Sequence, residues 1–292
     1  TLAFILIPIV TGIIVNDNPI FLVVTAAGCS LLLNYEVALF AGKAKDYSHI
    51  IIISALLISL FIIKYLFLVG EISKINYSQI TFFLLLLSVF LPGLIEVFKT
   101  SFELSIQKIG LSVMGFLYMG VIFGHVVELR FFINFSQKEL STAVGIIYLI
   151  YIFTIPWVYD TGGYFIGKYL GKKKIGLPAS PNKSWAGFMG GLIFVILGYF
   201  IWYQLMGVFY PNDLSQVIFY NNHQLGVFFS ISIAIFSQFG DLVESVFKRS
   251  AGVKDSSSII PGHGGLFDAI DSVITTSCLF FYLLLFIENK LG

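Results

Sequence analysis

Long apolar runs separated by short polar segments set the pattern of this chain. Nine runs are candidate membrane spans, and they cover Leu2–Val15, Pro19–Phe40, Ile50–Val69, Ile80–Phe98, Ile109–Val127, Ala143–Tyr159, Gly187–Met206, Leu225–Val246 and Gly265–Ile287. A helix needs about 20 apolar residues to cross a bilayer, and it satisfies its own backbone hydrogen bonds there. We therefore expect an all-α polytopic integral membrane protein with about nine transmembrane helices.

The composition supports a membrane location. The chain has 292 residues, of which 58% are hydrophobic and 11% are charged, and its mean hydropathy is +0.93. Soluble domains average about 25% charged residues, so a soluble globular protein is excluded. Cys29 and Cys278 both fall inside apolar runs, so no disulfide framework is expected. No positively charged leader with a cleavage site precedes the first run, so we expect no signal peptide.

Lysine and arginine are divided unevenly between the two sides of the membrane. If the nine spans alternate, the first side receives Lys43, Lys45, Lys99, Lys108, Lys168, Lys172, Lys173, Lys174, Lys183, Lys248, Arg249 and Lys254. The second side receives only Lys74, Arg130, Lys138 and Lys290. Because positively charged loops stay in the cytoplasm, we expect a cytoplasmic N-terminus and an external C-terminus. The polar segments with candidate chemistry then all face the cytoplasm.

Carboxylates gather where the last two spans meet the polar linker between them. Asp241, Glu244, Ser245 and Lys248 share one face of the eighth span, and Asp268, Asp271 and Ser272 share one face of the ninth. If these spans form an antiparallel pair, Asp241, Asp268 and Asp271 converge and repel one another in a low dielectric. A divalent cation would relieve this repulsion, and oxygen-only ligands favour Mg²⁺. Solvated interfacial charges and an ion or proton relay are the alternatives.

The linker before the ninth span carries glycines and cations that suit phosphate groups. Gly262, Gly264 and Gly265 directly precede the N-terminus of that span, where free N–H groups and the helix dipole favour anions. Lys248, Arg249 and Lys254 would add cationic donors. His263 is either a phosphate donor or acid, or a turn histidine with a structural hydrogen bond.

A second polar segment follows the sixth span. Asp160 ends that span, and the run Lys172–Lys174 is typical of a cytoplasmic loop that touches anionic lipid. Lys183 and Ser184 directly precede the seventh span, where they could hold a nucleotide phosphate. Glycines at the start of the seventh span more simply permit close helix packing.

Together these two segments resemble the CDP-diacylglycerol synthases of bacterial type, also called phosphatidate cytidylyltransferases. The signature of that family has a Ser, a Lys-Arg pair, a Lys-Asp pair, a His-Gly-Gly turn and two closing aspartates. The matching residues here are Ser245, Lys248, Arg249, Lys254, Asp255, Gly262, His263, Gly264, Gly265, Asp268 and Asp271. An upstream Ser-Pro-x-Lys-Thr element of the family is similar to Ser180–Ser184, and its aspartate before a glycine-rich segment is similar to Asp160.

The chain departs from the family pattern at three positions. Ala269 stands where the signature usually has a basic residue, which puts one phosphate or headgroup contact in doubt. Ser184 replaces the usual Thr and keeps the hydroxyl, and Ala186 stands where the family often has Glu or Gln. If the family reaction is retained, Lys248 and Arg249 would have to supply the missing positive charge.

The resemblance implies a nucleotidyltransferase of phospholipid biosynthesis in the inner membrane, with its active site on the cytoplasmic side. It would transfer CMP from CTP to phosphatidate, giving CDP-diacylglycerol and pyrophosphate. The implied catalytic residues are Asp241, Lys248, Arg249, His263, Asp268 and Asp271, with Asp241, Asp268 and Asp271 binding Mg²⁺ and, in a two-metal site, a second cation. The implied nucleotide- or phosphate-binding residues are Asp160, Lys183, Ser184, Lys254, Asp255, Gly264 and Gly265.

Two other functions use the same features. A CTP-dependent kinase of a polyprenol or similar lipid alcohol would share the membrane setting but release CDP. An ion-coupled transporter would use the intramembrane aspartates as its ion site, although the sequence has no internal repeat. The expected partners are CTP, phosphatidate and the bilayer, with no nucleic acid; a homodimer stays open. We expect residues 1–142 to be structural, lipid-facing spans and residues 143–292 to form the catalytic part with its cytoplasmic loops.

Overall fold

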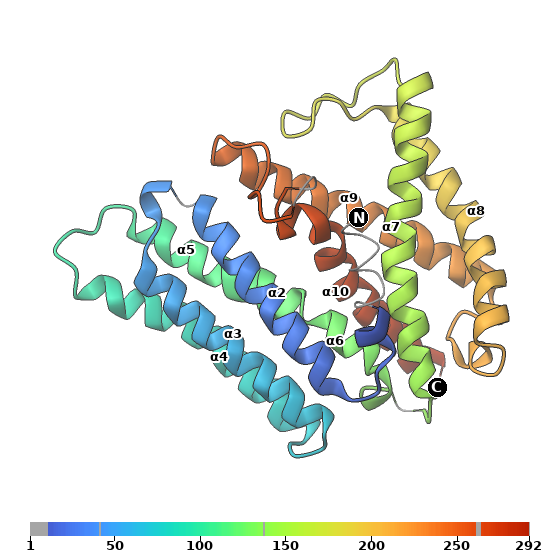
Figure 1. Cartoon of the computed structure of the whole chain (residues 1–292), viewed down its shortest axis with the longest axis horizontal. Coiled ribbons are helices and arrows are strands. Elements are labelled where there is room, and N and C mark those ends of the chain that lie inside the picture. Colours follow the sequence, from blue (N-terminus) through green and yellow to red (C-terminus); the bar gives the residue numbers. More distant parts are fainter. Residues whose placement is uncertain (1–10, 41, 137, 261–263, 292) are drawn as a thin grey trace. The chain divides into compact units, whose positions relative to one another are not determined.

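The computed structural model describes residues 11–40, 42–136, 138–260 and 264–291 (Figure 1). The α-helices in this part of the chain are α2 (Pro19–Phe40), α3 (Tyr47–Leu68), α4 (Lys74–Val97), α5 (Ser105–Phe116), α6 (His125–Arg130), α7 (Thr142–Leu170), α8 (Trp185–Phe209), α9 (His223–Ser250) and α10 (Leu266–Leu291). Eight helical segments among the described residues are long and apolar enough to cross a membrane, with Ser105–Arg130 counted as one. The protein is therefore an all-α polytopic membrane protein, as predicted.

Each predicted span from Pro19 onward coincides with one of these segments. The first predicted span, Leu2–Val15, falls largely outside the described residues. Two predicted boundaries are wrong by more than five residues. The fourth span begins at Lys74 rather than Ile80, and the sixth span does not end near Tyr159, because α7 continues through Asp160 to Leu170. The prediction stopped at the first acidic residue, whereas helix packing carries the helix beyond it.

The chain divides into two compact units. Unit 1 consists of residues 1–127 and 247–270, and unit 2 consists of residues 128–246 and 271–292. Helices α9 and α10 each contribute one end to each unit. The C-terminal part that the sequence analysis assigned to catalysis is thus shared, since residues 247–270 group with the N-terminal helices.

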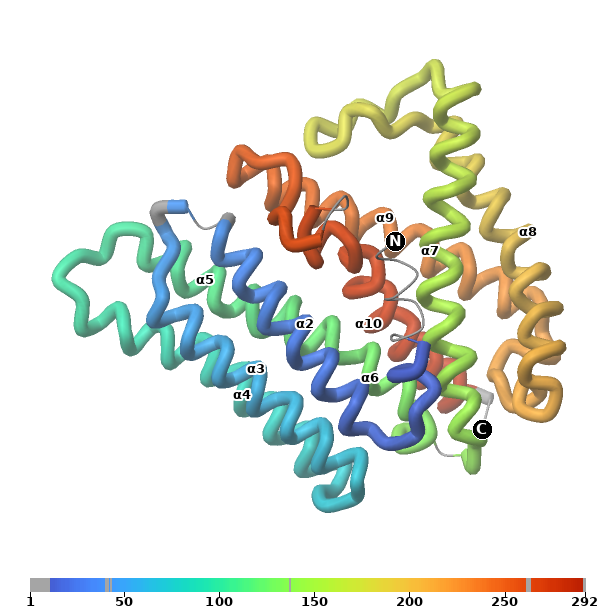
Figure 2. The backbone as a smooth tube through the Cα atoms, viewed as in Figure 1, coloured from blue at the N-terminus to red at the C-terminus, as the bar shows by residue number. Residues whose placement is uncertain are grey.

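Unit 1 is built around the hydrophobic faces of α2, α3, α4 and α5, which lie side by side (Figure 2). Leu57, Leu60 and Phe116 are fully buried in its core. After α5 the helix continues as a π-helical turn over Leu117–Ile122, a rare form that occurs mostly as single turns within α-helices. Ser30 of α2 stabilises this turn, because its Oγ donates a hydrogen bond to the Met119 carbonyl at 2.6 Å.

Unit 2 is organised by the close packing of α7 along α8. Glycines make the approach possible: a Cβ atom at Gly191 would lie 2.6 Å from the Tyr159 ring, and one at Gly187 would lie 2.9 Å from the Gly163 carbonyl. Small residues at helix interfaces are the usual way for membrane helices to pack tightly. This packing extends α7 past the apolar run and brings its polar end beside the start of α8.

Candidate active site

A cavity of about 360 Å³ lies in unit 2 between the C-terminal half of α7, the segment before α8, the start of α8 and α9. Its lining residues are Tyr159, Asp160, Gly163, Tyr164, Gly167, Lys168, Lys174, Ile175, Ser180, Asn182, Lys183, Ser184, Gly187, Phe188, Gln238 and Asp241. Pockets for small ligands are commonly about 300–1,000 Å³. The predicted residues Asp160, Lys183, Ser184 and Asp241 therefore line one cavity of sufficient size for a ligand.

Lys183 links the two carboxylates of this cavity. Its Nζ lies 2.6 Å from Asp241 Oδ2 and donates a hydrogen bond of 2.6 Å to Gln238 Oε1. Gln238 in turn donates through Nε2 to Asp160 Oδ1 at 3.1 Å. The ammonium of Lys183 is thus held between the Asp241 carboxylate and the Gln238 amide, and Gln238 connects it to Asp160.

Ser184 has a local structural role at the N-terminus of α8. It is the N-cap of that helix, and its Oγ accepts a hydrogen bond from the Gly187 N–H at 3.1 Å. N-cap serines satisfy one of the N–H groups that a helix start leaves unpaired. The hydroxyl that the sequence analysis offered to a nucleotide is therefore already used by the helix itself.

Three carboxylates meet where α9 and α10 cross in unit 2. One oxygen each of Asp241, Glu244 and Asp271 lies within 4.8 Å of the others. Gly240 allows this approach, because a Cβ atom there would lie 2.7 Å from the Asp271 carbonyl oxygen. Ser272 N–H donates to Asp271 Oδ1 at 2.5 Å, which fixes that side chain. The structure thus brings together Asp241 and Asp271, as expected, and adds Glu244.

Asp268 belongs to a different network, in unit 1. Its Oδ1 accepts a hydrogen bond of 2.6 Å from Lys248 Nζ. Its Oδ2 accepts from the Ser256 N–H at 2.7 Å, from Ser256 Oγ at 2.7 Å and from the Gly265 N–H at 2.8 Å. These four donors hold the Asp268 carboxylate in place within unit 1.

The other predicted residues of the linker lie at its surface or outside the described residues. Lys254 and Asp255 are exposed, and Arg249 donates to the Val253 carbonyl at 3.2 Å. Gly264 has φ +90°, which favours glycine. His263 lies outside the described residues, as does Gly262. Ala269, the departure from the family pattern, is exposed.

Sequence reasoning missed Gln238 and gave Glu244 too little weight. Both lie on the face of α9 that carries Asp241, three residues before it and three residues after it. Gln238 is an amide, so it carries no charge signal of its own. Its position on the acidic face was the available clue.

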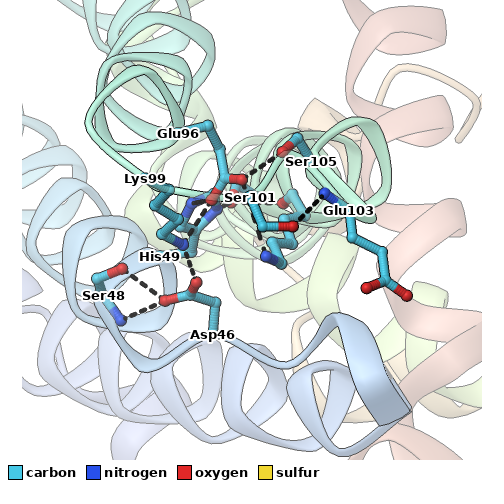
Figure 3. A network of polar contacts seen from close by, with 10 residues as sticks. Asp46, Ser48, His49, Glu96, Lys99, Ser101, Glu103 and Ser105 are labelled. Carbon is cyan, nitrogen blue, oxygen red and sulfur yellow. Dashed lines mark hydrogen bonds and ion pairs between the residues drawn. The ribbon is translucent and has the colours of Figure 1, made fainter.

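A second cluster of ionisable groups lies in unit 1 (Figure 3). The ligand atoms of Asp46, His49 and Glu96 lie within 4.8 Å of one another. Lys99 forms ion pairs with Asp46 and with Glu96, the latter at 2.6 Å, and His49 Nε2 lies 3.0 Å from Glu96 Oε1. Lys99 therefore supplies the positive charge that a metal ion would bring, and we interpret the cluster as a structural link between α3 and α4.

The ion pairs of this cluster shift the pKa values of Asp46 and Lys99, which lie outside the spans. Burial alone would raise the pKa of Asp46, but the hydrogen bonds and charge of Lys99, with the hydrogen bonds of Ser48, hold it well below its usual value. Burial would lower the pKa of Lys99, whereas Asp46 and Glu96 raise it above its usual value. Both groups thus favour the ion-paired form.

The protein thus combines membrane-spanning helices with a cavity lined by cations and carboxylates and with a group of three carboxylates. A sequence model of the Cytidylyltransferase family matches residues 1–287, so the chain belongs to that family of nucleotidyltransferases. A protein of Bacillus subtilis named phosphatidate cytidylyltransferase is 31% identical over 283 residues, which cover 94% of this chain and 96% of the relative.

Two further relatives bearing that name are similar over a shorter region. The protein of Haemophilus influenzae is 39% identical over 143 residues, which cover 49% of this chain and 47% of the relative. The protein of Staphylococcus haemolyticus is 40% identical over 140 residues, which cover 48% of this chain and 50% of the relative.

Proposed function

We propose that this protein is a phosphatidate cytidylyltransferase, which transfers CMP from CTP to phosphatidate and releases pyrophosphate. The observation that carries the proposal is the cavity of unit 2, in which Lys183 pairs with Asp241 and is connected through Gln238 to Asp160, within a chain of membrane spans. The family match over residues 1–287 and the names of the relatives support it.

The nucleotide is assigned to that cavity. Lys168, Lys174 and Lys183 line it and can face phosphate oxygens. Lys183 already makes two contacts of 2.6 Å, so its ammonium is held in place before a ligand arrives. Such preorganisation matters because phosphoryl transfer depends mainly on positioning and charge neutralisation.

The carboxylate group of Asp241, Glu244 and Asp271 fits Mg²⁺. All of its donors are oxygens, which hard divalent cations prefer, and they lie within 4.8 Å of one another. Bound there, the ion would neutralise the charge of the nucleotide phosphates. In its absence the three carboxylates repel one another at short range. Asp241 and Asp268 each have a lysine partner at 2.6 Å. Asp268, which the sequence analysis included, differs because three further donors from Ser256 and Gly265 already occupy its other oxygen.

The reaction needs no covalent intermediate. A phosphate oxygen of phosphatidate attacks the α-phosphorus of CTP, a new P–O bond forms, and the bond from the α-phosphorus to the bridging oxygen breaks as pyrophosphate leaves. Lys183 would stabilise the phosphate charge on the nucleotide side. We assign Lys248 and Arg249 to phosphate recognition because they are the cations next to the linker, and Asp268 orients Lys248 through its contact of 2.6 Å.

The excess of Lys and Arg on one side supports a cytoplasmic location for these groups, in the inner membrane of a bacterial cell. CTP would then arrive from the cytoplasm and phosphatidate from the adjoining leaflet. Labelling experiments test which side of the membrane these groups face. Single cysteines are introduced into the segment before α8, and their accessibility is measured in sealed inverted and right-side-out vesicles.

Product analysis tests the reaction. The purified protein is supplied with phosphatidate, Mg²⁺ and one of CTP, UTP, ATP or GTP, and the lipid and nucleotide products are separated. We expect CDP-diacylglycerol and pyrophosphate with CTP and little turnover with the other nucleotides. Release of CDP from a polyprenol substrate, or equal turnover of all four nucleotides, would contradict the proposal.

A further inference from the structure

Glu36 is a carboxylate inside the first fully described span, and its side chain is completely buried. It nevertheless has hydrogen-bond donors on every side. Its Oε1 accepts from the Leu266 N–H at 2.9 Å and from Ser257 Oγ at 2.6 Å. Its Oε2 accepts from the Phe267 N–H at 2.8 Å and, more weakly, from Ser256 Oγ at 3.4 Å. All of these donors are more than 200 residues away in sequence.

These contacts complete a helix start that its own sequence leaves incomplete. Helix α10 begins at Leu266, and Gly265 before it has no side chain that could act as an N-cap. Asp268, at the third helical position, supplies half of a capping box by accepting from the Gly265 N–H. The other half, an acceptor for the N–H groups of the first turn, comes from Glu36.

Gly265 is required for this arrangement. A Cβ atom there would collide with Ser256 Oγ and would lie 2.6 Å from Glu36 Oε1. Gly265, one of three glycines interpreted above as a phosphate cradle, therefore lets a carboxylate approach the backbone. The N–H groups of Gly265, Leu266 and Phe267 are all taken by carboxylate oxygens.

The same contacts reach the charged pair of unit 1. Ser256 donates to Asp268 through both its N–H and its hydroxyl, and the hydroxyl also faces Glu36. Asp268 in turn holds the ammonium of Lys248. A shift of the α10 start or of the Ser256–Ser257 segment would therefore move both charged groups.

We propose that Glu36 is a positioning residue for the transfer reaction: it fixes the N-terminus of α10 and the Ser256–Ser257 segment, and thereby orients Asp268 and Lys248. This inference rests on the proposed function. The role needs two acceptor oxygens, because both oxygens of Glu36 accept backbone N–H groups and a buried carboxyl group is tolerated only when hydrogen-bond partners surround it. Glutamine would keep one acceptor and turn an NH₂ group toward an N–H donor.

The test compares Glu36→Gln with Glu103→Gln, a matched control at an exposed carboxylate of the same unit. For Glu36→Gln we expect kcat to fall at least tenfold while KM for CTP changes less than threefold. We also expect faster amide hydrogen exchange in peptides that contain Leu266 and Phe267, with α3 and α4 peptides unchanged. The control should match the wild type in all of these measurements.

Three results would overturn the proposal. They are wild-type kcat in Glu36→Gln, loss of activity without local change in exchange, and a uniform rise in exchange across unit 1, which would indicate a general folding role. If the wild type makes no CDP-diacylglycerol, the proposed function fails, whereas the exchange comparison still tests the cap.

Ser257→Ala provides a milder second variant. It removes one donor to Glu36 and leaves the helix contacts in place. If the two residues act as one unit, Ser257→Ala lowers kcat several-fold in the wild-type background and less than twofold in the Glu36→Gln background. If the kcat of the double variant falls by the product of the two single-variant factors, the two residues act independently and the proposal is contradicted.

Discussion

Replacing Lys183 by Met tests the assignment of the cavity to the nucleotide. Methionine keeps the apolar stem and removes only the ammonium, which lies 2.6 Å from Asp241 Oδ2 and 2.6 Å from Gln238 Oε1. If that ammonium faces the phosphates during transfer, its loss should resemble the loss of one preorganised donor, about 2.7–4 kcal/mol. The side chain is 22% exposed, so water partly screens its charge and the lower end applies.

The expected loss in kcat/KM is therefore about 100-fold, since about 1.36 kcal/mol corresponds to a factor of ten. The assay follows CDP-diacylglycerol formation from CTP and phosphatidate in mixed micelles at saturating Mg²⁺. Lys183→Arg keeps the charge on a longer, planar group and should retain part of the activity.

Lys172→Met is the matched control, because Lys172 is an exposed lysine of the same segment and lies outside the cavity lining. It should keep full activity. A loss below threefold in Lys183→Met, or an equal loss in the control, would refute the assignment of Lys183 to the nucleotide phosphates.

Three further substitutions test other parts of the structure. Asp271→Asn removes one charge from the carboxylate group and should raise the Mg²⁺ concentration for half-maximal activity at least tenfold; an unchanged Mg²⁺ titration would argue against a metal there. Asp46→Asn removes the ion pair with Lys99 and should lower the unfolding temperature in detergent at pH 7, measured by calorimetry. Because the pKa of Asp46 is depressed in the folded state, the stability it contributes is present above its unfolded pKa of about 3.9 and is lost as pH falls further. The difference between wild type and Asp46→Asn should therefore shrink at pH 3, and a constant difference would contradict this origin. Gly191→Leu would force side-chain atoms against the Tyr159 ring and should cost about 1–3 kcal/mol, seen as a lower unfolding temperature; an unchanged temperature would mean that α7 and α8 separate without cost.

The spans could be predicted because their cause is local. About 20 apolar residues in sequence suffice for a membrane helix, and Pro19–Phe40 was predicted with the bounds that α2 has. The end of α7 could not be predicted in this way, since it depends on glycine contacts with α8. Those contacts join residues of two different helices, whereas a hydropathy pattern considers each apolar run by itself.

The candidate site was predictable only where spacing determines geometry. Asp241 and Asp271 come together because each lies on the inner face of one of two packed helices. Asp268 precedes Asp271 by one turn, so spacing alone gave both the same role. The difference arises from Lys248 and from the N–H groups of Ser256 and Gly265, which hold Asp268 in the structure.

Glu36 could not have been assigned from the sequence, because its partners lie more than 200 residues away. The available signal was the presence of an acid inside an apolar span, which is costly without a partner. Its donors are N–H groups of a helix start, and they become visible only when α2 and the start of α10 are placed together in unit 1.

Five acids of α2, α9 and α10 thus differ in what surrounds their carboxylates. Glu36 and Asp268 are surrounded by N–H, hydroxyl and ammonium donors, so their charges are neutralised by the protein itself, and a metal would have to displace those donors. Asp241, Glu244 and Asp271 are gathered against one another. Lys183 forms an ion pair with Asp241, and the remaining repulsion among the three carboxylates grows as the surroundings become less polar. An added cation gains most where carboxylates face each other, which is why we assign Mg²⁺ to the second group and a positioning role to the first.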